Sequence, residues 1–108
     1  MGGVEGSLVR DSRTGTLWYS STTGPNGPVK WAGAEIPTDA GARENMHLFV
    51  SHDEGSSWKL HTVVDTGLTS YSSVAVLNKP PGSSVGVLWE TGYRQGIPKA
   101  IVYRAVAA

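Results

Sequence analysis

Glycine and proline interrupt nearly every apolar stretch of this chain, and this feature most limits the folds open to it. The 108 residues include 14 glycines and six prolines, and no window carries a sustained apolar repeat of helical period. The apolar segments are short and rich in β-branched and aromatic residues, which favours strands. We therefore expect an all-β fold. Strands are predicted at residues 6–10, 16–21, 46–51, 58–64, 71–77, 85–90 and 99–106.

A long polar connection, residues 22–45, separates the second predicted strand from the third. It contains Gly-Pro-Asn-Gly-Pro at residues 24–28, a strong signal for turns. A loop of this length inside a compact domain is usually functional or poorly ordered. We therefore interpret the segment as a loop.

Composition excludes several classes of partner and chemistry. The formal net charge is zero, and no basic run is present, which argues against nucleic acid or acidic membranes as the main partner. Cysteine is absent, so disulfides and thiolate chemistry are excluded. No apolar run approaches the roughly 18 residues of a transmembrane segment. His47, His52 and His61 show no ligand spacing, and we expect no metal and no other cofactor.

Residues 51–58, Ser-His-Asp-Glu-Gly-Ser-Ser-Trp, gather groups that could serve as acid, base and nucleophile. The same residues also predict a tight turn, because they lie between two apolar runs. Gly55 accepts a positive φ without steric cost, and the Asp53 carboxylate can accept hydrogen bonds from turn amides. We favour the turn over catalysis at Asp53, and we expect His52 and Glu54 to be solvated loop residues.

The seven predicted strands divide into a set of four and a set of three. Four-stranded antiparallel units are the blades of a β-propeller. We therefore predict a partial β-propeller, with one blade at about residues 1–66 and a final blade at about residues 67–108 that lacks its outer strand. Because fewer than two blades cannot close a ring, we expect the chain to be the C-terminal part of a larger propeller.

The turn also resembles a known motif, the Asp box or BNR repeat of sialidases and other propellers. That motif has the form Ser-x-Asp-x-Gly-x-x-Trp and lies between the third and fourth strands of a blade, where its role is structural. The chain matches it at Ser51, Asp53, Gly55 and Trp58.

Three further elements resemble the closing section of the exo-α-sialidase (neuraminidase) family, whose fold is a six-bladed propeller. Arg43 precedes the third strand, Tyr-Ser-Ser-Val opens a strand at residues 71–74, and Gly-Val-Leu-Trp-Glu forms residues 86–90. With the Asp box, these elements follow the family's order over nearly the whole chain. Trp89 departs from the family, which usually has tyrosine at this position.

The resemblance implies a glycoside hydrolase that releases terminal sialic acid from sialylated glycoconjugates. Such enzymes retain anomeric configuration and use a tyrosine nucleophile. Tyr71 would be this nucleophile. Arg43 would be one of three arginines that bind the carboxylate of the sugar, for which a guanidinium is well suited. Glu90 would hold the first arginine of this cluster in place without touching the sugar.

The rest of the family's site has no counterpart in this chain. The acid/base aspartate, the glutamate that activates the tyrosine and the other two arginines are all missing. We therefore expect the isolated chain to be inactive and the remaining propeller blades to be its partners. The compartment stays open, and would be lysosomal or secreted if the parent follows the family.

Other interpretations remain. The chain could instead be a non-catalytic Asp-box propeller segment that binds glycans or proteins, or a degenerate fragment without function. Without the family resemblance, Tyr71 would be interpreted as a half-buried packing residue, and Arg43 as a solvated loop residue paired with Glu44, which contributes little to stability.

Overall fold

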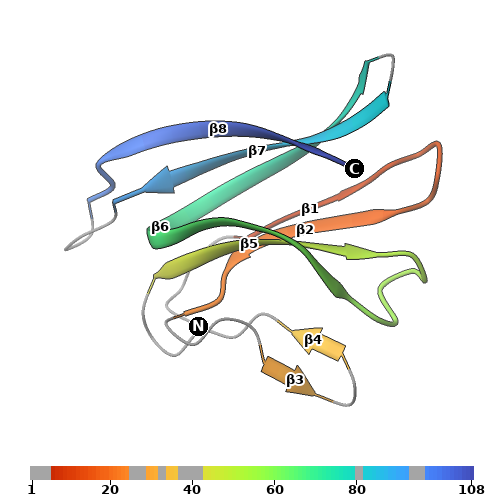
Figure 1. Cartoon of the computed structure of the whole chain (residues 1–108), viewed down its shortest axis with the longest axis horizontal. Coiled ribbons are helices and arrows are strands. Elements are labelled where there is room, and N and C mark those ends of the chain that lie inside the picture. Colours follow the sequence, from red (N-terminus) through yellow and green to blue (C-terminus); the bar gives the residue numbers. More distant parts are fainter. Residues whose placement is uncertain (1–5, 25–28, 32–33, 37–42, 80–81, 93–96) are drawn as a thin grey trace.

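A computed structural model describes residues 6–24, 29–31, 34–36, 43–79, 82–92 and 97–108. All regular secondary structure in these residues is β, so the predicted all-β class is confirmed (Figure 1). The strands are β1 (Ser7–Arg10), β2 (Leu17–Thr22), β3 (Val29–Trp31), β4 (Ala34–Ile36), β5 (Glu44–Ser51), β6 (Lys59–Lys79), β7 (Gly82–Thr91) and β8 (Ala100–Ala107).

Six of the strands form one antiparallel sheet in the order β1-β2-β5-β6-β7-β8. This sheet curls into a half-barrel, with β7 and β8 on one side and β1, β2 and β5 on the other (Figure 1). Strand β6 passes from one side to the other. Its first part pairs with β5, and its last part pairs with β7.

The predicted boundaries need two corrections. The connection at residues 22–45 is not a loop throughout, because β3 and β4 form a separate antiparallel pair within it. Val29 and Ile36 are partners in this pair, and both are β-branched residues, which favour strands. The other residues from 25 to 42 lie outside the described part of the chain.

The second correction concerns residues 65–70, where a break was expected between two strands. The structure continues β6 through them, because Leu68 pairs with Glu44 of β5 and Thr69 pairs with Thr91 of β7. Both sides of the segment therefore find hydrogen-bonding partners. The boundary predicted near residue 66 falls inside β6, and the division into two blades stays a prediction.

The hydrophobic core lies between the two sides of the curled sheet. Side chains alternate along β7, so Val85, Val87 and Trp89 are buried, whereas Leu88 between them is exposed. Full burial of one such valine contributes about 1.5–3 kcal/mol relative to exposure. The buried cluster consists of Trp18, Met46, Leu48, Val50, Val64, Val74, Val85, Val87, Trp89 and Val106.

The turn at residues 51–58 connects β5 to β6, the third and fourth strands of the six-stranded sheet. The Ser51 hydroxyl donates to Asp53 Oδ1 at 2.9 Å and accepts the Gly55 N–H at 2.9 Å. Asp53 also accepts the Ser57 N–H at 2.8 Å and the Ser57 hydroxyl at 2.5 Å. The bonds from Ser57, followed by the bond from Ser51, lower the pKa of Asp53 to about 2. The carboxylate is therefore engaged in holding the turn.

Two further contacts tie this turn to the sheet. The ring of half-buried Trp58 packs edge-on against Tyr19, with centroids 6.1 Å apart. Glu54 is exposed, as expected, but it also forms a bidentate pair with Arg10, with N···O distances of 2.6 and 2.7 Å. This pairing was not predicted, because Arg10 and Glu54 meet only after β1 and the turn are aligned.

Candidate functional site

Strand β6 contains a β-bulge opposite Glu90. Thr69 pairs with Thr91 and Ser72 pairs with Trp89, so two residues of β6, Ser70 and Tyr71, face the single residue Glu90 of β7. Such a bulge bends its strand and redirects the side chains that it carries. Ser70 is fully buried, whereas Tyr71 keeps 43% of its surface exposed. The bulge therefore presents the tyrosine side chain to solvent.

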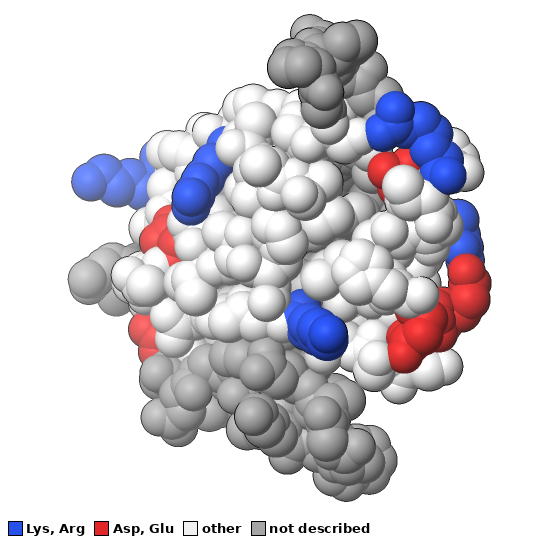
Figure 2. Space-filling model, turned by 45° about the vertical axis from the view of Figure 1, so that its right-hand side comes forward, with Lys and Arg blue, Asp and Glu red and all other residues white. Residues whose placement is uncertain are grey.

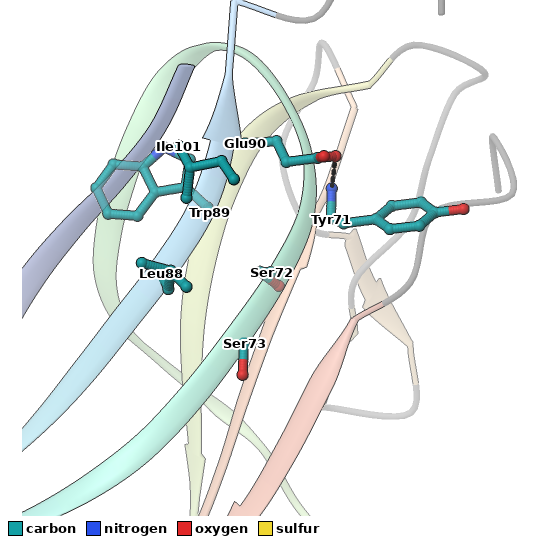
Figure 3. Close-up of a pocket in the computed structure, with 7 residues that line it drawn as sticks. All are labelled: Tyr71, Ser72, Ser73, Leu88, Trp89, Glu90 and Ile101. Atoms are coloured by element: carbon teal, nitrogen blue, oxygen red, sulfur yellow. Dashed lines mark hydrogen bonds between the residues drawn. The ribbon is translucent and has the colours of Figure 1, made fainter. Parts of the chain in front are cut away.

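Glu90 holds the backbone of this bulge. Its Oε1 accepts the Tyr71 N–H at 3.2 Å (Figure 3). A bulge leaves one residue without its normal ladder partner, and here a carboxylate from the facing strand supplies the acceptor. The family resemblance predicted that Glu90 holds an arginine of the carboxylate-binding cluster in place, and that role stays a prediction.

Arg43 lies beside Tyr71. Its backbone carbonyl accepts the Thr69 N–H at 2.9 Å, and its Nη1 donates to the Ser70 hydroxyl at 3.1 Å. The guanidinium carbon lies 5.8 Å from the centroid of the Tyr71 ring, within the range of a cation–π interaction. The structure thus brings together Arg43 and Tyr71, which the sequence predicted to share a site, and joins them to Glu90.

Ser70 was not identified from the sequence. Its hydroxyl is the acceptor that orients the Arg43 side chain. In a regular strand the side chains of Ser70 and Tyr71 would lie on opposite faces of the sheet. Nothing in the local sequence pattern indicates a bulge at these two residues.

The Tyr71 hydroxyl is not engaged by the part of the chain that the structure describes. No hydrogen bond to it is formed by the described residues, and the ring points away from Trp89 and Ile101 in Figure 3. Within these residues, therefore, no base is in place to take the phenolic proton.

A shallow hollow of about 220 Å³ lies next to the bulge. It is small compared with typical ligand pockets of about 300–1,000 Å³, so it suits a small group rather than a whole oligosaccharide. Leu88 and Ile101 give it an apolar wall, and both are exposed. The lining residues are Tyr71, Ser72, Ser73, Leu88, Trp89, Glu90 and Ile101 (Figure 3).

Asp65 supports the same region from the other face of β7. Its Oδ2 accepts the indole N–H of Trp89 at 3.0 Å and the hydroxyl of Thr91 at 2.9 Å. Its Oδ1 accepts the Gly67 N–H at 2.8 Å. Partial burial raises the pKa of Asp65, but these three hydrogen bonds outweigh that effect and lower the pKa below its ordinary 3.8.

No family model, curated protein or solved structure matches this chain. The likeness to sialidases therefore depends on the motifs quoted above.

A second cavity of about 180 Å³ lies at the opposite end of β2, near the turn at residues 11–16. It includes His52, His61, Asp11 and Trp18. Partial burial lowers the pKa of His61, whose ring packs edge-on against Trp18 with centroids 4.9 Å apart. Within the described ranges, no three acidic or histidine side chains are grouped closely enough to hold a metal ion.

Charged side chains lie mostly around the margin of the face in Figure 2, around a largely uncharged surface. In the described part of the chain, no helix has the length and apolar character needed to cross a membrane.

Proposed function

We propose that this chain supplies part of the substrate site of an exo-α-sialidase that removes terminal sialic acid from glycoconjugates. In this proposal Arg43 binds the carboxylate of the sugar, and Tyr71 is the nucleophile. The observation that carries the proposal is the position of the Arg43 guanidinium carbon, 5.8 Å from the centroid of the exposed Tyr71 ring.

The chemistry of Arg43 fits an anionic sugar. A guanidinium presents its N–H donors in a planar fork that matches both oxygens of a carboxylate. The Ser70 hydroxyl holds Nη1, and the Tyr71 ring borders the group, so the fork has a defined orientation before any ligand arrives. Such preorganisation reduces the entropy lost on binding.

Tyr71 then acts on the anomeric carbon of the bound sugar. Its phenolic oxygen forms a bond to that carbon while the glycosidic C–O bond breaks and the departing oxygen takes a proton from a general acid. Water next cleaves the tyrosyl–sugar bond, which releases sialic acid and restores the phenol. Because a phenol approaches as a neutral group, it avoids repulsion with the substrate carboxylate.

The general acid and the base for Tyr71 come from the remaining propeller blades in this proposal. A tyrosine without its base is a weak nucleophile, since its proton is held at neutral pH. We therefore expect the isolated chain to bind a sialoside carboxylate and to hydrolyse a fluorogenic sialoside at no useful rate.

A non-catalytic function in glycan or protein binding is the alternative. It is favoured by the exposed apolar wall of the hollow beside Tyr71, formed by Leu88 and Ile101. A binding segment of this kind would use the Tyr71 ring as a contact surface and would not require Arg43.

Titration of the chain with the methyl α-glycoside of sialic acid tests the proposal. Arg43→Gln should weaken binding about tenfold or more, because a hydrogen bond to a charged group contributes about 1.5–3 kcal/mol. Arg104→Gln, which changes an exposed arginine on β8, is the matched control and should bind like wild type. Equal affinity in the Arg43→Gln variant, or equal binding of a neutral galactoside, would overturn the proposal.

A further inference from the structure

The Asp65 carboxylate holds both neighbours of Glu90 with a single oxygen. Oδ2 accepts the Trp89 indole N–H at 3.0 Å and the Thr91 hydroxyl at 2.9 Å. Side chains alternate along a strand, so those of Trp89 and Thr91 share one face of β7 and that of Glu90 lies on the other. Asp65 therefore restrains β7 on each side of Glu90 without touching Glu90 itself.

The carboxylate is also tied to its own strand. Oδ1 accepts the Gly67 N–H at 2.8 Å, two residues further along β6 and shortly before the bulge. The carboxylate lies close against Gly67, because a Cβ atom built there would be 3.2 Å from Asp65 Oδ1. This anchoring gives the carboxylate a fixed position, so the donors of β7 are held relative to the start of the bulge in β6.

The bulge needs such a restraint. Between Thr69 and Ser72, β6 has one residue more than β7, and the ladder alone does not decide where the extra residue lies. The bond from the Tyr71 N–H to Glu90 Oε1 marks the observed register. A shift of Glu90 along or away from β6 would lose this bond and move the Tyr71 ring relative to Arg43.

We propose that Asp65 is a positioning residue that sets the register of the bulge, keeping Glu90 on the Tyr71 N–H and the Tyr71 ring beside Arg43. An effect of Asp65 on catalysis, through the position of Tyr71, rests on the proposed sialidase function. The positional claim rests on the contacts of Asp65 with Trp89, Thr91 and Gly67 and can be tested without any ligand.

A purely structural role for Asp65 predicts something different. Trp89 is 7% exposed, and a buried indole N–H needs a partner. If Asp65 served only this need, its loss would lower stability but leave the backbone of Tyr71 unchanged in the folded molecules. The two roles therefore differ in what happens at Tyr71.

The test follows the Tyr71 backbone amide by NMR in the full chain. Glu90→Ala first defines how far the Tyr71 amide signal moves when the side-chain acceptor is lost. Asp65→Ala should then move the signal through most of the same shift, and the double variant should add little to either single change, because both act on one bond. Asp65→Asn keeps one oxygen for the donors of β7 and should give an intermediate shift. Glu54→Gln, which alters the exposed carboxylate paired with Arg10, is the control and should leave Tyr71 unchanged.

An unchanged Tyr71 amide in folded Asp65→Ala overturns the proposal. If Asp65→Ala does not fold, Thr91→Val removes one donor with little change of shape, and a wild-type Tyr71 signal in that variant is equally decisive against it. Failure of the wild-type chain to bind a sialoside would overturn the proposed function and leave the positional claim standing.

Discussion

The Glu90 carboxylate accepts the backbone N–H of Tyr71 at 3.2 Å, from the strand that faces the β-bulge. This bond links the exposed tyrosine to β7, while Ser70, the other bulge residue, accepts a hydrogen bond from Arg43. The bulge thus links Tyr71 to Arg43 and Glu90, which are well separated from it in the sequence.

Removal of the Glu90 acceptor should weaken the fold by a modest amount. Glu90→Ala leaves the Tyr71 N–H without its partner, and we expect a loss of about 1 kcal/mol in the free energy of unfolding. Glu90→Gln retains an oxygen at the same place and should lose less. Urea unfolding followed by tryptophan fluorescence measures both. Equal stability of Glu90→Ala and wild type would mean that the bond contributes nothing.

Asp53 should matter for folding and not for ligand binding. Asp53→Ala removes the acceptor of two bonds from Ser57 and one from Ser51, so the urea midpoint should fall while affinity for a sialoside stays unchanged. His52→Ala, at the neighbouring exposed position, should leave the midpoint near wild type. A selective loss of binding in folded Asp53→Ala would instead place Asp53 in the ligand site.

The Asp53 carboxylate should make the free energy of unfolding depend on pH in the acidic range. The pKa of Asp53 is lowered from 3.8 to about 2 in the folded chain, so its ionised form stabilises the fold above pH 3.8, and this contribution disappears as the pH falls towards 2. Asp53→Ala should therefore lose less stability than wild type between pH 5 and pH 2. Parallel curves of unfolding free energy against pH for the two proteins would contradict this account.

Gly55 has a backbone conformation that other residues rarely adopt. Its φ is 85°, in the left-handed region, where an L-residue costs about 1–2 kcal/mol. Gly55→Ala should lower the free energy of unfolding by about that amount. Gly55→Asn should lower it less, because asparagine tolerates this region better. Thermal unfolding of the two variants checks the order, and a reversed order would contradict it.

The outer edge of β8 and its exposed apolar side chains should cause copies of the chain to associate with one another. Within the described residues β8 pairs only with β7, and Ile101 and Tyr103 on its surface are 66% and 58% exposed. An open apolar edge of this kind promotes strand pairing between molecules. Sedimentation velocity should show mass that rises with concentration, and Ile101→Lys should suppress the rise more than Val63→Lys on β6. A wild-type chain that stays monomeric throughout would refute this prediction.

The all-β class followed from local properties of the sequence. Glycine and proline argued against long helices, and short segments rich in β-branched and aromatic residues, such as residues 85–90, indicated strands. The continuity of β6 did not follow, because Asp65 and Gly67 have the composition of a turn. Only the pairing of Leu68 and Thr69 with two different strands makes that segment extended.

The candidate site was predictable only in part. Arg43, Tyr71 and Glu90 were selected by resemblance to a family motif, and the structure brings them together. Ser70 and Asp65 were missed, because their roles depend on the bulge and therefore on the register between β6 and β7. Register is a property of two paired strands, and a single stretch of sequence does not reveal it.

The position of a bound sugar on the protein decides whether Arg43 and Tyr71 form a sialoside site. Isotope-filtered NOE spectra of the labelled chain with the methyl α-glycoside of sialic acid report which side chains touch the ligand. We expect contacts between the sugar and the Tyr71 ring, and their loss in Arg43→Gln at the same ligand concentration. A sugar that contacts Leu88 and Ile101 but not Tyr71, or that keeps its Tyr71 contacts in Arg43→Gln, would contradict this expectation.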